Sequence, residues 1–214
     1  YWFGDQAKTD AAFAAAKHHL TYEISDNRII CNSMEPRGAY AEWDGARMHL
    51  CFGGQGVWGM KDHLAANYGL DREQIRVTNP DVGGGFGMKG MPYPEYLVLP
   101  HAARVVGGPV RWMSERTEAM LTDNAGRDLV STAELALDEN LKIIGYRVSN
   151  IFNLGAYNSY FAQAIQSELF IRVLMGTYDV QAACLRSRAI YTNTTQVDAY
   201  RGAGRPEAIY VLER

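Results

Sequence analysis

The pattern of apolar and polar positions predicts helices and strands in mixed order. An alanine-rich segment over about residues 9–20, capped by Thr9 or Asp10, predicts the first helix. Apolar residues then alternate with polar ones over 20–24, which is typical of a half-buried strand. Further strands are predicted at residues 40–43, 47–52, 75–77, 110–114, 130–137, 142–152 and 189–191. Further helices are predicted at 57–68, at 94–106 and around Pro206 at the end of the chain.

Turn residues between these segments indicate how the elements connect. Asp44-Gly45 separates one pair of strands and Asp138-Glu139-Asn140 separates another, which predicts two β-hairpins. This order predicts an α+β fold of mixed sheets with packed helices. Gly107-Gly108-Pro109 is the strongest internal break. We therefore expect one subdomain over 1–108 and a second over 109–214.

Composition and charge exclude several classes of protein. The 214 residues are 47% hydrophobic and 21% charged, with a formal net charge of -3, which fits a soluble globular protein. Such a charge offers no broad positive surface for nucleic acid or an anionic membrane. No apolar run approaches the roughly 20 residues that span a bilayer. The chain begins without Met and ends in a helical pattern, so we expect it to be a piece of a longer protein.

Candidate metal ligands are scarce along the chain. The three cysteines lie far apart, so we expect small buried thiols in a reducing cytoplasm and neither disulfides nor iron–sulfur ligands. His18 and His19 fall in the last turn of the predicted first helix, where adjacent side chains diverge by about 100°. That divergence makes them a poor clamp for one ion, so capping or solvation is expected. We expect no metal-ligating side chain.

The stretch Gly85–Gly90 fits the dinucleotide fingerprint G-x-G-x-x-G. A strand precedes it, and Glu115 lies 25 residues beyond it as a candidate ribose ligand. However, Pro92 and Pro94 stand where the first helical turn of a dinucleotide site should run, and Pro is unfavourable beyond the start of a helix. A dehydrogenase that binds NAD is therefore only the third hypothesis.

Three glycine loops, at 53–56, 83–87 and 202–204, each follow a predicted strand and precede a helix. Glycines let backbone N–H groups approach a ligand closely, and helix starts favour anions. Each loop also carries or adjoins one distinctive side chain, and these are Gln55, Phe86 and Arg201. If the loops converge, they could line a site for a phosphate-bearing cofactor. Three ordinary tight turns with incidental side chains remain the alternative.

These motifs, taken together, resemble those of the molybdenum hydroxylases, the family of xanthine dehydrogenase, aldehyde oxidase and aerobic carbon monoxide dehydrogenase. The resemblance spans essentially the whole chain and rests on several motifs in the expected order. They are Met34-Glu35-Pro36-Arg37, Gly54-Gln55-Gly56, Gly83 to Lys89, Arg111 to Glu118 and Ala199 to Glu207. The family's large subunit binds a molybdopterin cofactor, often as the cytosine dinucleotide, whose dithiolene sulfurs hold the molybdenum.

The resemblance implies a role for each matching residue. Gln55 would hydrogen-bond a ligand of molybdenum, and Arg201 would stabilise negative charge on bound substrate in the manner of an oxyanion hole. Phe86 would shape the site with its ring. The candidate cofactor-binding positions are Gln55, Gly84, Gly85, Phe86, Gly87, Arg201, Gly202 and Ala203, and the candidate catalytic ones are Arg201, Gln55 and Phe86.

The family reaction needs more than this chain offers. Its glutamate general base lies beyond residue 214 by resemblance, so the chain alone is expected to be incomplete and inactive. Electrons would leave through iron–sulfur clusters and FAD, and these require partner subunits or domains. The remainder of the large subunit and a small-molecule substrate complete the expected partners. A cofactor-docking module without turnover is the competing hypothesis.

Three positions narrow the substrate by resemblance. Gly202 stands where carbon monoxide dehydrogenase proper carries a copper-binding cysteine, so carbon monoxide oxidation is disfavoured. Gly90 and Ala203 stand where xanthine-oxidising members carry a substrate-binding glutamate and an aromatic wall. An aldehyde or an N-heterocycle other than xanthine is left. A carbon monoxide dehydrogenase-like large chain of unknown substrate is the alternative within the family.

Overall fold

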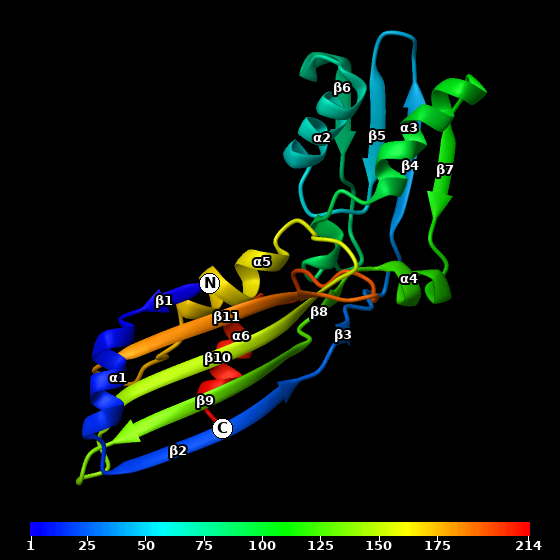
Figure 1. The fold of residues 1–214 in the computed structure, drawn as a ribbon. Coiled ribbons are helices and arrows are strands. Elements are labelled where there is room, and N and C mark those ends of the chain that lie inside the picture. The colour runs from blue at the N-terminus through cyan, green and yellow to red at the C-terminus, as the bar shows by residue number, and fades with distance from the viewer. The chain divides into compact units, whose positions relative to one another are not determined.

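The computed structural model describes all residues from Tyr1 to Arg214 and divides into two compact units. Unit 1 comprises Tyr1–Ile30 and Asn124–Arg214, and unit 2 comprises Cys31–Asp123. Both units combine sheets with helices, which confirms the predicted α+β class (Figure 1). No helix is both long enough and apolar enough to cross a membrane.

Unit 1 is built on a five-stranded sheet in the order β1-β11-β10-β9-β2. Its strands are β1 (Trp2–Gly4), β2 (His18–Asp26), β9 (Leu129–Leu137), β10 (Ile143–Gly155) and β11 (Ala183–Tyr191). The predicted second hairpin is confirmed, because β9 and β10 pair antiparallel, whereas β10 and β11 run parallel. Two short strands, β3 (Ile29–Ile30) and β8 (Ala125–Gly126), pair separately.

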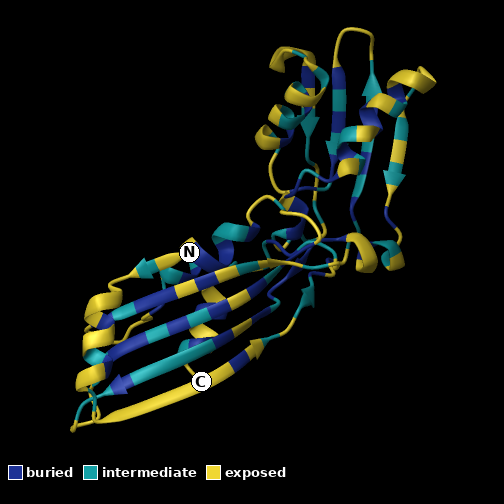
Figure 2. Cartoon of the chain, in the orientation of Figure 1, coloured by how far each residue is buried: buried dark blue, intermediate teal, exposed yellow.

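Helices cover both faces of this sheet. The helix α1 (Gln6–Ala15) lies so close to β10 that a Cβ at Gly145 would approach the Ala12 methyl to 3.1 Å. The opposite face packs against α5 (Ala162–Ala164), the π-helical segment Ile165–Leu169 and α6 (Arg205–Leu212). Buried residues of this layer include Phe152, Phe170 and Leu185. Buried positions recur along the central strands of the sheet, whereas β2 at its edge is largely exposed (Figure 2). The main core of unit 1 therefore lies between the sheet and its later helices.

Both predicted ends of the first helix, at about residues 9 and 20, were wrong. The helix begins at Gln6, because the Asp5 carboxylate accepts a hydrogen bond from the Lys8 N–H and caps it. It ends at Ala15, and His18 and His19 belong to β2, where they pair with Leu137 and Ala136 of β9. Pairing with a distant strand overrides the local helical pattern here.

Unit 2 is a four-stranded sheet in the order β6-β5-β4-β7. Its strands are β4 (Gly38–Trp43), β5 (Met48–Phe52), β6 (Ile75–Thr78) and β7 (Val110–Met113). Its helices are α2 (Trp58–Tyr68), α3 (Pro94–Val106) and α4 (Arg116–Thr122), with 3₁₀ turns at Arg72–Gln74 and Met88–Gly90. Alternate residues of β5 are buried, so one face of the sheet packs against the helices. The predicted hairpin of β4 and β5 is confirmed.

The expected subdomain boundary between 108 and 109 falls inside unit 2. The strand β7 follows that point but pairs antiparallel with β4, and α3 packs against both strands. Gly107 is a left-handed residue that ends α3, so the glycine-rich break is a helix terminus. The chain passes between the units at 30–31 and 123–124 instead.

Arg37 is one of two fully buried basic residues of unit 2, the other being Lys89. Its guanidinium bonds Asp123 at 2.5 Å and Glu95 through two nitrogens at 2.9 and 3.1 Å, and it lies 3.7 Å from the centre of the Tyr93 ring. Burial disfavours its charge, but the two carboxylates outweigh burial and raise the pKa of Arg37. Arg37 lies directly before β4 and thereby connects the start of that strand to α3 and to the residue that ends α4.

Replacing Arg37 with Met should destabilise unit 2 by about 3–5 kcal/mol, because the Asp123 carboxylate would remain buried without its partner. Arg72→Met is the matched control, since the Arg72–Asp62 pair is about half exposed and its loss should cost no more than about 0.5 kcal/mol. Native-state hydrogen exchange of the β4 and β5 amides in the full-length protein measures both. Equal protection in the two variants would contradict this role.

Candidate functional site

Two of the predicted loops meet within unit 2. The strands β5 and β6 are parallel neighbours, so the loops that follow them leave the same edge of the sheet. The first loop carries Gln55, whose Oε1 accepts a hydrogen bond from the Gly87 N–H at 2.7 Å. The Gln55 N–H in turn donates to the Lys89 carbonyl at 3.2 Å. The structure therefore brings Gln55 and the glycine loop together, a convergence that the sequence left open.

The glycines at this contact are required by space and by backbone conformation. A Cβ at Gly85 would lie 2.5 Å from the Gln55 Oε1, which is closer than atoms approach without displacement. Gly84 and Gly87 have φ values of 95° and 99°, a region that favours glycine. Between them, Phe86 also has a left-handed backbone (φ 53°), and its ring is 41% exposed. The loop thus carries backbone strain next to an exposed aromatic ring.

The contact with Gly87 fixes which end of the Gln55 amide faces outward. A backbone N–H can only donate, so the atom opposite Gly87 must be the oxygen. The Nε2 hydrogens are then the groups that this exposed side chain can present to a ligand. None of the loop's backbone hydrogen bonds is donated by Gly84 or Gly85, and both residues are partly exposed, so their N–H groups are available to a ligand. This part of unit 2 is a set of hydrogen-bond donors.

A buried lysine holds the glycine loop in place, and sequence reasoning missed it. Lys89 is fully buried, and its Nζ bonds the Glu35 carboxylate at 2.6 Å. The same carboxylate oxygen accepts from the Gly83 N–H at 3.0 Å, and the Glu35 N–H donates to the Gly83 carbonyl at 3.1 Å. Glu35 lies in the Met34 to Arg37 motif, and its pairing with Lys89 spans 54 positions of sequence. We call Lys89, Glu35 and Gly83 the lysine clamp.

The third predicted loop, residues 202–204, belongs to unit 1. Arg201 is exposed, and the next three residues, Gly202, Ala203 and Gly204, all have positive φ values of 97°, 40° and 81°. The helix α6 then begins at Arg205, with Pro206 as its second residue. Gly202 and Ala203, predicted to contact a cofactor, therefore lie in a strained turn directly before a helix.

Behind this loop, Glu207 and Arg127 form a buried ion pair. Glu207 is in the first turn of α6, and only 1% of it is exposed. Its Oε1 is 3.0 Å from Nη1 of Arg127, a residue that sequence reasoning did not select. The two residues lie 80 positions apart, so no local pattern could have revealed the pair.

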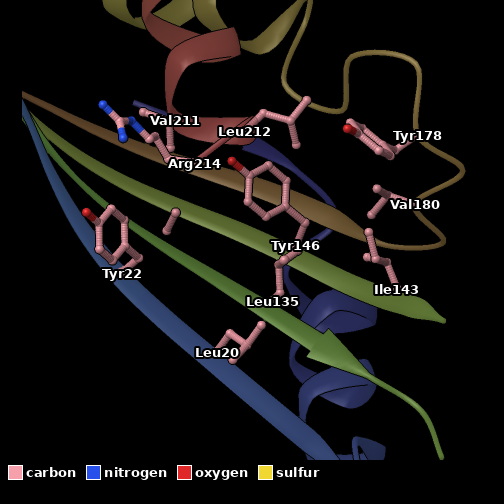
Figure 3. A pocket seen from close by; sticks show the side chains of 11 residues that line it. Leu20, Tyr22, Leu135, Ile143, Tyr146, Tyr178, Val180, Val211, Leu212 and Arg214 are labelled. Carbon is pink, nitrogen blue, oxygen red and sulfur yellow. The ribbon is translucent and has the colours of Figure 1, made fainter. Parts of the chain in front are cut away.

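A separate pocket of about 290 Å³ lies in unit 1 between the sheet and the end of α6 (Figure 3). Its lining is mainly apolar and includes Leu20, Leu135, Ile143 and Val211. None of the predicted site residues lines it. The pocket therefore takes no part in the candidate cofactor site.

Donor-rich glycine loops with buried charged supports are typical of a cofactor-binding domain. Comparison with known proteins identifies the cofactor, because residues 2–214 match the family model of the molybdopterin cofactor-binding domain. The chain belongs to this family and, within it, to the molybdenum hydroxylases. The resemblance inferred from the sequence motifs is confirmed.

Individual relatives agree with this assignment. The 6-hydroxypseudooxynicotine dehydrogenase complex subunit gamma of Paenarthrobacter nicotinovorans is 34% identical, over 96% of this chain and 26% of that protein. The structure of carbon monoxide dehydrogenase from Oligotropha carboxidovorans matches all of this chain and 27% of its own, with 29% identity and a TM-score of 0.92. Quinoline 2-oxidoreductase from Pseudomonas putida 86 matches 95% of this chain and 28% of its own, with 29% identity and a TM-score of 0.86. The chain thus spans about a quarter of the length of these relatives.

Gly85→Ala in the full-length protein should displace the Gln55 side chain and reduce bound molybdenum and pterin at least tenfold. The reason is the 2.5 Å approach between the added methyl position and the Gln55 Oε1. The control is Gly59→Ala in α2, where the added methyl meets open space. Metal analysis and pterin fluorescence of the purified protein provide the measurement. Full cofactor content in the Gly85 variant would contradict the role of this contact.

The lysine clamp should also make stability depend on pH. Burial raises the pKa of the Glu35 carboxyl, but the hydrogen bonds from Lys89 and Gly83 and the Lys89 charge outweigh burial and lower that pKa overall. The ionised carboxylate therefore stabilises the fold above the unfolded-state pKa of about 4.3, and this stabilisation is lost as the pH falls through the lower folded-state pKa. Wild type should melt at a higher temperature than Glu35→Gln at pH 7, with a difference that shrinks below about pH 4.

Thermal unfolding of the full-length protein over this pH range provides the measurement. The control is Glu139→Gln in the exposed hairpin turn, which should leave Tm unchanged at every pH. A Glu35→Gln deficit that stays constant down to pH 3 would show that the Glu35 charge has no part in the clamp.

Proposed function

We propose that the chain is the molybdopterin-binding portion of a molybdenum-dependent oxidoreductase that hydroxylates an aldehyde or an N-heterocycle with oxygen derived from water. The family assignment establishes the cofactor class. The observation that carries the proposal further is the contact between Gln55 and the glycine loop, which leaves a cluster of outward donors.

The donors of unit 2 fit a molybdopterin cofactor. Gln55 would donate from its Nε2 to an oxygen ligand of the metal, and the N–H groups of Gly84 and Gly85 would donate to the cofactor. Phe86, exposed beside them, would limit the space open to a substrate. When bound, the cofactor holds molybdenum through its dithiolene sulfurs and supplies the oxygen-transfer and electron-accepting chemistry. The protein supplies orientation and hydrogen bonds.

We assign Arg201 to the substrate side of the same reaction. Its exposed guanidinium is permanently charged and offers several N–H donors in a fixed plane. Donors that are fixed before negative charge develops on a substrate oxygen stabilise the transition state more than the ground state. Gly202 and Ala203 would let the loop backbone approach the cofactor closely.

Gly202 argues against carbon monoxide as the substrate. The resemblance places a copper-binding cysteine at this position in carbon monoxide dehydrogenase proper. Here a Cβ at Gly202 would lie 2.4 Å from the Pro206 ring, and φ is 97°. A cysteine would need a different backbone at this turn, so we propose no copper site. Ala203 and Gly90 likewise lack the contacts that the resemblance assigns to xanthine sites.

Two of the relatives are named for N-containing aromatic compounds, namely quinoline and 6-hydroxypseudooxynicotine. This supports an N-heterocycle over an aldehyde as the first substrate class to test. We further propose that the complete protein works with iron–sulfur and flavin partners, carries the pterin as a cytosine dinucleotide and acts in the cytoplasm. The three free cysteines fit a reducing compartment.

The full-length protein, purified natively with its partners, should contain molybdenum and pterin in near-equal amounts. It should oxidise quinoline or benzaldehyde with a dye as electron acceptor, and carbon monoxide should give no dye reduction. Substantial carbon monoxide oxidation would contradict the substrate class. Absence of molybdenum and pterin together with binding of NAD would contradict the whole proposal, and a loaded protein without turnover would indicate a docking module.

Arg201→Ala in the same protein should lower kcat by about 10²–10³-fold while molybdenum content stays within twofold of wild type. The matched control is Arg188→Ala, because Arg188 is exposed in the same unit on β11 and should leave kcat unchanged. Steady-state kinetics normalised to molybdenum content separates the two effects. Loss of molybdenum with normal turnover per metal would place Arg201 in cofactor binding instead.

A further inference from the structure

Arg127 holds the loop that carries Arg201 through hydrogen bonds to its backbone. Nη1 of Arg127 donates to the Tyr200 carbonyl at 2.9 Å, and Nη2 donates to the Arg201 carbonyl at 3.0 Å. The guanidinium also lies 4.8 Å from the centre of the Tyr200 ring. Two consecutive carbonyls are therefore fixed by one planar group, which restricts rotation of the peptide that joins Tyr200 to Arg201.

The charge of Arg127 is neutralised inside the protein. Nη1 also bonds the Glu207 carboxylate at 3.0 Å, and the same Glu207 oxygen accepts from the Gln166 Nε2 at 2.9 Å. Arg127 is 8% exposed and Glu207 1%. Because Glu207 compensates Arg127, the exposed positive charges next to the turn are those of Arg201 and of Arg205, which bonds the Gly202 carbonyl, rather than that of Arg127.

The turn after Arg201 needs such a support. Three consecutive residues adopt positive φ, and one of them is Ala203, whose side chain makes that conformation costly. The Ala203 N–H donates to the Tyr200 carbonyl at 2.8 Å, so the carbonyl that Arg127 holds also closes the turn. Tyr200 also packs closely against Gly126, where an added Cβ would lie 2.3 Å from the Tyr200 Cβ. The loop therefore leaves no room for a side chain at position 126.

We propose that Arg127 and Glu207 are positioning residues of the reaction, and that they act by fixing the conformation from which Arg201 meets the substrate. This inference rests on the proposed role of Arg201. Lys in place of Arg127 keeps the charge but cannot span two carbonyls and a carboxylate with a planar fork. Arg127→Lys should therefore loosen the loop without removing the compensated charge.

The first readout does not depend on activity. In the full-length, cofactor-loaded protein, Arg127→Lys should speed hydrogen exchange of the peptide over 199–204 at least tenfold, with unchanged molybdenum content. The control is Arg147→Lys, because Arg147 bonds Glu134 through two nitrogens in the same unit but contacts no residue of the loop. It should leave exchange at 199–204 unchanged. If Arg127→Lys does not accumulate, Glu207→Gln tests the same contact with the same expected result.

The second readout tests whether Arg127 affects turnover through the position of Arg201. With quinoline or benzaldehyde and a dye acceptor, Arg127→Lys should lower kcat by about 10–100-fold, since small misplacement of a reacting group has effects of this order. In the Arg201→Ala background the same substitution should have no further effect, because coupled residues are non-additive.

Two results would overturn the inference while leaving the proposed function intact. One is that Arg127→Lys leaves hydrogen exchange over 199–204 unchanged, while Arg201→Ala still lowers kcat. The other is an equal loss of kcat from Arg127→Lys in both backgrounds. If instead Arg201→Ala turns over normally, the role proposed for Arg201 fails, and the positioning role of Arg127 fails with it.

Discussion

The hydrogen bond from the Gly87 N–H to the Gln55 Oε1 is the contact on which the cofactor site of unit 2 depends. It requires two parallel neighbouring strands, because only then do the loops after β5 and β6 leave the same sheet edge. It requires glycine at position 85, where any side chain would enter the space of Gln55. It also turns the Gln55 amide outward as a donor, which suits an oxygen ligand and not a cation.

The glycine loop of unit 2 and the Arg201 loop of unit 1 are each bonded to an ion pair of a buried basic residue and a glutamate. Lys89 and Glu35 hold the glycine loop of unit 2, and Arg127 and Glu207 hold the Arg201 loop of unit 1. An ion pair with a buried member adds little net stability compared with an apolar substitute, because desolvation offsets most of the attraction, although removing one partner destabilises the fold. Its directional bonds nevertheless fix backbone groups that would otherwise relax from positive φ. We interpret these pairs as devices for geometry, placed where the loops bear strain.

Local patterns predicted much of the fold. The two hairpins, the helix ended by left-handed Gly69 and the helix that begins at Pro94 all follow from turn residues and periodicity, and all are present. The first helix was mispredicted, because His18 and His19 take their conformation from pairing with β9. The π-helical segment Ile165–Leu169 had no recognisable local signal. The predicted loops could be found because glycine spacing is a local property, whereas Glu35, Lys89 and Arg127 act through partners many tens of residues away.

The central claim is that Gln55 and the glycine loop hold the molybdopterin cofactor through outward N–H donors. The most direct measurement is an experimental structure of the full-length protein with its cofactor bound. We predict the Gln55 Nε2 within about 3.2 Å of an oxygen ligand of molybdenum, and the N–H groups of Gly84 and Gly85 within the same distance of cofactor or ligand acceptors. A cofactor bound elsewhere, or a Gln55 amide turned with its oxygen toward the metal ligands, would contradict the account.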